Sequence, residues 1–360
     1  MKKMKGLTYA KSGVVGLEGL SSFDGFLVWI KKTLKNHPEV KTEIGLYATI
    51  LQITPKLGMA LSTDGVGTKL LVAEMMNKYD TVGIDCVAMN VNDIICVGAR
   101  PIAMLDYIAL QDVKKKFLVD LGKGLYKGAL DAEISIPAGE IAQLKEMVTG
   151  LHEGMGFDLV GCAVGLVDMD KIILGDNIKE GDVVVGLAST GIHSNGYTLA
   201  RKALLRKHKV GTYFKELGRT VGEELLEPTR IYVRPAMKML DQKIKVKAFL
   251  HITGDGFRNL RRIPSKVGFV LDSLPKPPPI FPLMQREGNL SNEEMANTFN
   301  MGVGLCVVVS EKDAPKVLSV SKKFGIPAQV IGRAVADKEK KIIIPSMNVM
   351  GKKERFFTLD

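Results

Sequence analysis

A short polar turn follows an apolar stretch in the first quarter of the chain. The segment "LSTDGVGTKLLVA" (residues 61–73) contains Asp64, two glycines and Lys69. A turn after a strand can aim several backbone N–H groups at one anion, and glycines allow the positive φ angles that this needs. Asp64 would then bind Mg²⁺ while Lys69 balances phosphate charge. The alternative is a tight turn with a surface salt bridge, because the segment fits neither a Walker A loop nor a dinucleotide fingerprint.

A second polar pair interrupts the apolar stretch "MNVNDIICVGA". Asn90 and Asp93 are three residues apart, so a helix would place them on one face and the valines and isoleucines on the other. Polar groups inside so apolar a helix need partners. A metal ion or a neighbouring backbone group would supply them.

Two glycine-bracketed turns in the second half each contain a histidine. In "STGIHSNGYTLARK", Asn195 is a suitable N-cap for the following helix, whose first N–H groups favour an anion. His193 in this turn could donate a proton or a hydrogen bond, and a simple capping turn is the alternative. In "HITGDGF", His251 and Thr253 offer the donors that phosphate sites use, and a loop histidine without a catalytic role is the alternative.

The composition is that of an ordinary globular protein. The chain has 360 residues, 46% of them hydrophobic and 25% charged, and this length predicts two domains. The net charge of +11 is spread over separate basic runs without interleaved aromatics, which favours a small anionic ligand over nucleic acid. We expect a cytoplasmic protein without a membrane partner, because there is no signal peptide and no apolar run of about 18 residues. The four cysteines are far apart and predict buried, reduced thiols.

Short β-branched runs alternate with helical patterns and predict an α/β or α+β fold. The predicted strands cover residues 57–63, 102–110, 158–168, 182–189, 267–273 and 301–309, and the predicted helices cover 81–98, 112–130, 196–208 and 312–324. A polar stretch after residue 168 predicts a boundary between a domain of residues 1–170 and a domain of residues 171–360. Because glycine-rich polar turns recur in both halves, we expect the ligands to lie in a cleft between the domains.

Taken in order, these stretches resemble the phosphoribosylformylglycinamidine cyclo-ligases, or aminoimidazole ribonucleotide synthetases. The matching runs include "STDGVGTKLLVA", "GIDCVAMNVNDIICVGARPIAMLDYIAL", "GLASTGIHSNGYTLARKAL", "LLEPTRIYVRPAMKML", "HITGDGF" and "TFNMGVG". The resemblance implies a two-domain α/β (α+β) fold. The N-terminal sheet would form a barrel at the interface of a homodimer, and the C-terminal domain would contain a mixed sheet with helices.

The resemblance also implies a reaction in purine biosynthesis. ATP would phosphorylate the formyl oxygen of formylglycinamidine ribonucleotide, an amidine nitrogen would attack the activated carbon, and phosphate would leave. The products would be aminoimidazole ribonucleotide, ADP and phosphate, and the protein would act chiefly by positioning and electrostatics. One alternative is a thiamine-phosphate kinase or selenophosphate synthetase type of enzyme. Another is a nucleotide-binding or nucleic-acid-binding protein that has lost catalysis.

The resemblance further implies a set of site residues. The ATP site would comprise Asp64, Gly65, Val66, Gly67, Thr68, Lys69, Asp93 and Glu140, and Mg²⁺ would be bound by Asp64, Asp93 and Glu140. The substrate site would comprise His193, Ser194, Asn195, Thr253, Gly254 and Asn300. The catalytic residues would be Lys69, His193 and His251, and either histidine could shuttle the proton of ring closure.

Several positions depart from the family pattern. Ala138, Ile141 and Gln143 stand where glycine, threonine and glutamate are usual; Asp255 replaces a glycine, Asn297 an arginine and Val15 an aspartate. The changes at 141 and 143 remove a hydroxyl and a carboxylate near Glu140. Asp255 adds a negative charge where a substrate phosphate would lie.

Overall fold

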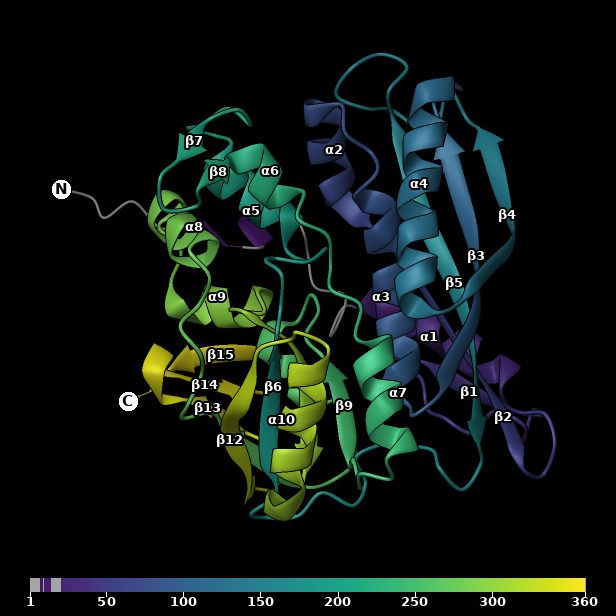
Figure 1. The fold of residues 1–360 in the computed structure, drawn as a ribbon, viewed down its shortest axis with the longest axis vertical. Helices are drawn as coiled ribbons and strands as arrows, with labels where there is room; N and C mark the ends of the chain where they lie inside the picture. The colour runs from purple at the N-terminus through teal and green to yellow at the C-terminus, as the bar shows by residue number, and fades with distance from the viewer. Residues whose placement is uncertain (1–6, 9, 14–20, 360) are drawn as a thin grey trace.

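Two large sheets, each flanked by helices, dominate the fold (Figure 1). The computed structural model describes residues 7–8, 10–13 and 21–359, so Val15 lies outside the described residues. The first large sheet uses strands between residues 49 and 168, and the second uses strands between residues 183 and 358. The predicted α/β (α+β) class is confirmed.

The first sheet has five strands in the order β1-β2-β5-β3-β4. These are β1 (Thr49–Gln52), β2 (Leu57–Gly65), β3 (Arg100–Leu110), β4 (Ser135–Gln143) and β5 (Phe157–Asp168). All neighbours pair antiparallel except β3 and β4, which are parallel. Side chains alternate along β3, so Met104 and Ile108 are buried while Leu105 and Tyr107 are exposed on the other face. One face of this sheet is therefore covered and the other is open.

The second sheet has eight strands in the order β15-β14-β13-β10-β12-β6-β11-β9. These are β6 (Val183–Ala188), β9 (Ala248–His251), β10 (Val267–Val270), β11 (Val303–Val309), β12 (Ala328–Ala336), β13 (Ile342–Ile344), β14 (Val349–Lys352) and β15 (Arg355–Thr358). The sheet is mixed, because β10 and β13 are parallel and the other neighbours are antiparallel. Every residue of β11 is buried, as expected for a continuous apolar run in a central strand.

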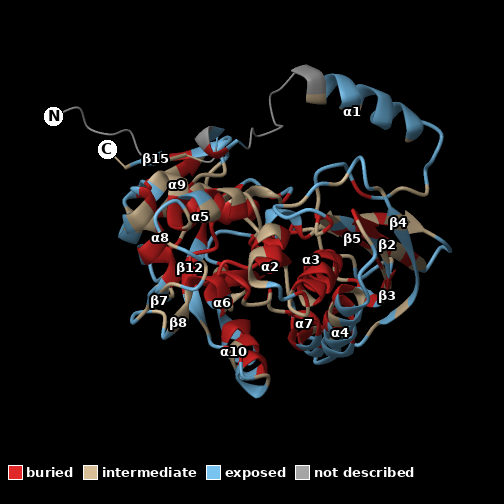
Figure 2. Cartoon of the chain, turned by 90° about the horizontal axis from the view of Figure 1, so that it is seen from above, coloured by how far each residue is buried: buried red, intermediate tan, exposed pale blue. Residues whose placement is uncertain are grey.

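The helices other than α1 pack beside and between these sheets (Figure 1 and Figure 2). In the first half they are α1 (Ser21–Thr33), α2 (Leu70–Met76), α3 (Val82–Cys96) and α4 (Lys115–Ala132). In the second half they are α5 (Tyr197–Leu204), α6 (Val221–Leu225), α7 (Val233–Asp241), α8 (Ile280–Gly288), α9 (Asn292–Thr298) and α10 (Ala314–Lys323), and a small hairpin joins β7 (Tyr213–Phe214) to β8 (Arg219–Thr220). Among the described residues, no helix is both long enough and apolar enough to cross a bilayer.

Helix α3 lies between the two halves and is almost entirely buried (Figure 2). It packs against β2 and β5 of the first sheet and also against β9 and α7 of the second half. Its neighbour α4 approaches closely because glycines face each other: a Cβ on Gly83 would lie 2.4 Å from the Leu125 nitrogen. By contrast, Figure 2 shows α1 exposed and apart from the body of the chain.

The observed elements agree with most of the predicted ones. The helix predicted over 81–98 is α3, and the helix predicted over 196–208 is the shorter α5. The prediction that Asn195 caps α5 is wrong, since the N-cap is Gly196 at φ 73°, without a side-chain hydrogen bond. All four cysteines are free and three of them are buried, while Cys162 is half-buried.

Candidate functional site

The ends of β2 and β9 and the second half of α3 meet between the two sheets. Each contributes one ionisable side chain, namely Asp64, His251 and Asp93. The Asp93 Oδ1 atom lies 2.8 Å from Nδ1 of His251, which is fully buried. Asp64 is close enough for the Asp93 charge to act on it. The structure therefore brings together three residues that lie far apart in the sequence.

The surroundings of Asp64 disfavour the charged form of its side chain. Burial, and then the neighbouring Asp93 carboxylate, raise its pKa to about 6. A hydrogen bond from the Gly65 N–H and the charges of His251 and Arg262 offset only part of this increase. A carboxylate whose charged form is this unfavourable gains from a bound cation, and carboxylate oxygens are the ligands that Mg²⁺ prefers.

Asn90 fixes the end of β2 on α3. Its Nδ2 donates to the Asp64 carbonyl (3.1 Å) and its Oδ1 accepts from the Asp64 N–H (2.9 Å). The same amide donates to the Cys86 carbonyl one turn back in the helix. Of the two partners predicted for Asn90, the backbone is the one observed.

The turn after Asp64 is only partly free to bind an anion. The Val66 N–H donates to the Leu159 carbonyl, and Val66 itself is buried. Gly67 has the positive φ, 69°, that the glycine-rich turn predicts. Gly67 and Thr68 are both exposed, so these two positions could face a ligand.

Lys69 is fully buried and does not extend into an open cleft. Its ammonium lies 2.8 Å from the Asp85 carboxylate and donates to the carbonyls of His193 (3.1 Å) and Glu227 (2.7 Å). Three acceptors use all three ammonium protons. The geometry therefore gives Lys69 a positioning role, joining the first half of the chain to two segments of the second. The contact of Lys69 with phosphate stays a prediction, although all of its ammonium protons have acceptors within the chain.

His193 is held in a strained, buried position. Its φ of 69° is in the left-handed region, and its Nε2 accepts a hydrogen bond from the Thr190 N–H at 3.3 Å. Burial, together with the nearby charges of His251 and Lys69, lowers its pKa well below the usual value, so the ring is neutral. Only glycine fits at 304, because a Cβ there would lie 2.5 Å from Cε1 of His193.

Two buried ring nitrogens have no hydrogen-bond partner in the described part of the chain. They are Nδ1 of His193 and Nε2 of His251. Since Nε2 of His193 accepts a bond, Nδ1 of this neutral ring has the proton and is an unused donor. Nδ1 of His251 faces the Asp93 carboxylate and would donate to it, so Nε2 of the neutral ring is an unused acceptor. Buried polar atoms without partners are uncommon, and here they indicate a place for a polar ligand.

The other predicted substrate residues line the same two turns. The Ser194 hydroxyl lies 3.0 Å from the Thr229 hydroxyl, and the Thr253 hydroxyl donates to Asn259. A Cβ on Gly254 would be 3.3 Å from the Asn195 side-chain oxygen, so the two turns touch. The structure brings these residues together.

Asn300 is also beside these turns, but its amide is already occupied. Its Nδ2 donates to the carbonyls of Gly191 and Ile192, and its Oδ1 accepts from the Ser189 hydroxyl and the Gly302 N–H. Asn300 therefore holds the His193 turn in place. The predicted direct contact with substrate has no free amide group to make it.

The unusual Asp255 is neutralised by two arginines. Its carboxylate pairs with Arg258 and, at 3.0 Å, with Arg262. The Arg262 guanidinium also lies 5.0 Å from the centre of the Tyr47 ring. The negative charge that the sequence placed at this turn is therefore balanced within the chain.

The structure does not bring Glu140 together with Asp64 and Asp93, the other two predicted magnesium ligands. In the register of the first sheet, Asp64 shares a row with Gly161, Asp106 and Gly139, whereas Glu140 pairs with Tyr107 in the next row. Successive strand residues point to opposite faces, so Glu140 lies on the open face. The described residues contain no group of three or more metal-binding side chains.

Sequence reasoning missed Asp85, which holds the centre of the interface between the halves. It is fully buried and accepts from the Thr229 N–H (2.7 Å) and hydroxyl (2.6 Å) as well as from Lys69. A detectable signal was present, because Asp85 is a lone carboxylate in the apolar stretch "GIDCVAM". Like Asn90 and Asp93, a carboxylate inside so apolar a helix needs a partner.

Family models place this two-domain arrangement in a known class. Residues 45–167 match the model described as "AIR synthase related protein, N-terminal domain", and residues 179–345 match "AIR synthase related protein, C-terminal domain". The chain is thus an AIR synthase related protein. The structure of T. maritima PurL complexed with ADP shares its fold, with a TM-score of 0.56, 13% identity, and coverage of 86% of this chain and 46% of that one.

Sequence relatives define the family more narrowly. The phosphoribosylformylglycinamidine cyclo-ligase of Methanocaldococcus jannaschii is 52% identical over 279 residues, which is 77% of this chain and 78% of the relative. That of Methanobrevibacter smithii is 43% identical over 337 residues, covering 93% and 96% respectively. The chain belongs to the phosphoribosylformylglycinamidine cyclo-ligase family, and the resemblance seen in the sequence is confirmed.

Proposed function

We propose that this protein catalyses the ATP-dependent closure of formylglycinamidine ribonucleotide to aminoimidazole ribonucleotide, releasing ADP and phosphate, in purine biosynthesis. Family membership supports the reaction. The cluster of Asp64, Asp93 and His251 beside His193 supports it most directly, because two buried ring nitrogens there are left for a ligand. The thiamine-phosphate kinase alternative is disfavoured, because a solved enzyme of that kind is only 17% identical.

Asp64 and Asp93 are the proposed magnesium ligands. Bound Mg²⁺ would supply positive charge against the phosphates of ATP, and ATP itself is supported by the nucleotide complexes of T. maritima PurL with ADP and AMPPCP. The raised pKa of Asp64 fits this role, since a cation would stabilise its charged form. Gly67 and Thr68, exposed at the following turn, would contact the phosphates.

The two histidines are proposed to have different roles in the chemistry. The Nδ1–H of His193 would donate to a substrate oxygen, because this ring is neutral and its other nitrogen is occupied. The free Nε2 of His251 would accept the amidine proton during ring closure, with Asp93 orienting the ring through Nδ1. Lys69 would position the His193 turn rather than contact the ligand.

Following ADP release with each candidate substrate tests the proposed function. Pure protein with ATP and Mg²⁺ is expected to turn over formylglycinamidine ribonucleotide and neither thiamine phosphate nor selenide. Turnover of either of the latter would select another enzyme of the superfamily. Absence of turnover together with salt-sensitive RNA binding would select a protein that has lost catalysis.

We also propose a cytoplasmic homodimer that packs through the open face of the first sheet. This face exposes Leu105 at 44% and Tyr107 at 40%, and Glu140 is beside them on the edge strand. Large apolar side chains gathered on one sheet face are typical of an interaction surface. The proposed domains remain residues 1–170 and 171–360, with the first supplying the dimer contact.

Replacing Leu105 with lysine is expected to convert the dimer to a monomer, because a buried unpaired ammonium opposes packing of the two sheets. Light scattering during size-exclusion chromatography measures the mass. Val119→Lys is the matched control, since Val119 is 47% exposed on α4, a helix on the covered side of the sheet. If both variants remain dimers, the open face is not the interface.

A further inference from the structure

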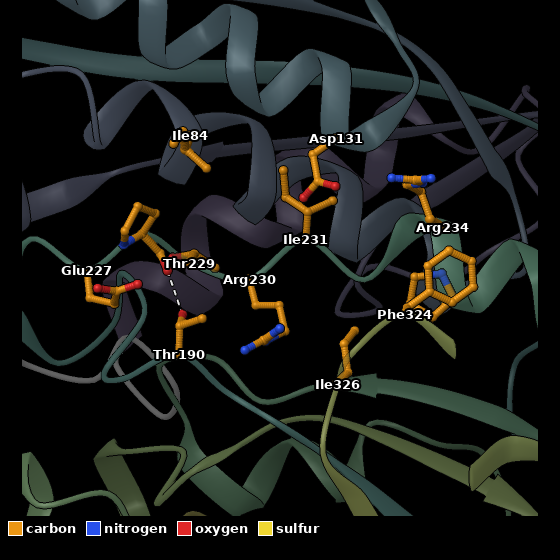
Figure 3. A pocket seen from close by; sticks show the side chains of 12 residues that line it. Ile84, Asp131, Thr190, Glu227, Thr229, Arg230, Ile231, Arg234, Phe324 and Ile326 are labelled. Atoms are coloured by element: carbon orange, nitrogen blue, oxygen red, sulfur yellow. Dashed lines mark hydrogen bonds between the residues drawn. The ribbon is translucent and has the colours of Figure 1, made fainter. Parts of the chain in front are cut away.

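A cavity of about 360 Å³ lies between the two halves of the chain, outside the candidate site (Figure 3). Its lining includes Ile84 of α3, Asp131 of α4, the segment 227–231, and Phe324 and Ile326 after α10. None of the residues assigned to the magnesium or the two histidines lines it. The volume is within the range of small-molecule sites, roughly 300 to 1,000 Å³.

The cavity and the candidate site lie on opposite sides of α3. Ile84 lines the cavity and Asp93 belongs to the site, and the two are nine residues apart on one helix. At 3.6 residues per turn, nine residues correspond to about two and a half turns, so the side chains point in opposite directions about 13 Å apart along the axis. A molecule in this cavity would not occupy the place of the proposed ATP and magnesium.

Arg230 forms no salt bridge in the described part of the chain, and the carboxylate whose charge acts on it is that of Asp131 in the same cavity lining. The Arg230 side chain extends among the lining residues, and its buried Nε has no hydrogen-bond partner in the described part of the chain. The other lining charges are partly satisfied: Arg234 pairs with Glu133 at 3.3 Å, and Glu227 pairs with Arg219 at 2.6 Å. Because a guanidinium presents a fork that matches phosphate, Arg230 favours a phosphate group as its partner.

The remaining walls favour a flat ring and a sugar. Ile84, Ile231, Phe324 and Ile326 supply apolar surface. The Arg234 guanidinium lies 5.6 Å from the centre of the Phe324 ring. This ring is therefore where the apolar part of the lining meets the charged part. The Asp131 carboxylate, which also lines the cavity, would accept hydrogen bonds from hydroxyl or amino groups.

We propose that this cavity binds a nucleoside monophosphate, with the phosphate on Arg230, the base against Phe324 and ring or sugar donors on Asp131. The bound molecule would change the position of the turn that contains His193, because two residues that line the cavity are hydrogen-bonded to this turn or to its support. Thr190 donates its N–H to His193, and Thr229 donates to Asp85, the partner of Lys69. The cavity is therefore a regulatory site coupled to the position of His193.

Calorimetric titration of the full chain with AMP tests this site without any measurement of turnover. Arg230→Gln is expected to weaken AMP binding by about tenfold or more, as for loss of a charge-assisted hydrogen bond. Phe324→Ala is expected to weaken binding of AMP but not of inorganic phosphate, which provides a second variant if Arg230→Gln fails to fold. Lys322→Gln, a charge removal on the exposed side of neighbouring α10, is the matched control and is expected to bind AMP normally.

The Asp64→Asn variant distinguishes AMP binding in this cavity from AMP binding at the proposed ATP site. AMP affinity is expected to be unchanged in this variant, because Asp64 lies on the other side of α3. If AMP binding is lost with Asp64→Asn and kept with Arg230→Gln, AMP occupies the candidate site and the inference is overturned. Absence of measurable AMP binding to the unmodified protein overturns it as well. Neither result depends on which reaction the protein catalyses.

Discussion

Asp64→Asn is expected to lower kcat by at least about 100-fold, the scale on which removal of one preorganised electrostatic group acts. The neutral amide keeps the size of the side chain and can still accept the hydrogen bond from the Gly65 N–H. It loses the negative charge that would hold Mg²⁺ beside the phosphates. Steady-state ADP release measures the effect.

The same substitution is expected to stabilise the fold at neutral pH. Burial raises the pKa of Asp64 from 3.8 to about 6, so the folded state binds this proton more tightly than the unfolded state does. The stability that this proton contributes is complete below pH about 4 and is lost as the pH rises through about 6. At pH 7.5, the charged side chain therefore destabilises the fold, on the order of 2 kcal/mol, and asparagine removes that cost.

Urea unfolding of the unmodified protein and of Asp64→Asn, without Mg²⁺ at pH 4.5 and pH 7.5, tests the direction of this stability change. The variant is expected to be the more stable at the higher pH, with a smaller difference at the lower pH. Asp168→Asn is the matched control, because Asp168 lies on β5 at the opposite end of β2, paired with Leu57. Normal turnover by Asp64→Asn would refute the proposed magnesium role of Asp64.

Lys69→Met is expected to lower the free energy of unfolding by about 3 to 5 kcal/mol, because it leaves the Asp85 carboxylate buried without its cation. Two backbone carbonyls, of His193 and Glu227, lose their donor at the same time. Activity should fall largely because the turn that presents His193 is no longer held. Urea unfolding and ADP release, measured on the same preparation, give both effects.

The double variant Lys69→Met/Asp85→Asn distinguishes a structural role of Lys69 from a direct role in catalysis. Asparagine keeps an acceptor for Thr229 while removing the unpaired charge, so the double variant should regain part of the lost stability. Activity should recover in parallel if Lys69 only positions the turn. A Lys69→Met protein as stable as the original but inactive would instead support the contact with phosphate predicted from the sequence.

The regular elements were predictable because their side chains repeat with a clear period. Helix α3 was predicted over 81–98 and observed over 82–96, since its apolar residues recur at helical spacing. Strand β4 was not predicted: as an edge strand it leaves every one of its residues exposed or half-buried, so no alternation marks it. Whether a central segment is a helix or a strand follows from its local sequence pattern. The edge strand β4, by contrast, is a strand because it pairs with β3.

The composition of the candidate site was predictable, and its geometry only in part. The residue types of the turns at 64–69, 190–196 and 251–256 indicated polar sites without showing which of them meet. The burial of Lys69 could not be predicted, because its acceptors at His193 and Glu227 lie 124 and 158 positions away. A lysine after a glycine-rich turn is indistinguishable, by local pattern, from one that faces a ligand.

The contacts of α3 with the segment 229–232 have a consequence for how this protein can be divided. Asn92 accepts from the Tyr232 N–H and donates to the Arg230 carbonyl, while Asp85 accepts from the Thr229 N–H. A cut of the chain near residue 170 would yield two pieces that each expose half of this buried interface. Asp85 and Asn92 would lose their partners on one piece, and the backbone groups of residues 229–232 would lose theirs on the other. We expect the two pieces to aggregate when made separately and to recover only if co-expressed, so the gene should resist being split in two.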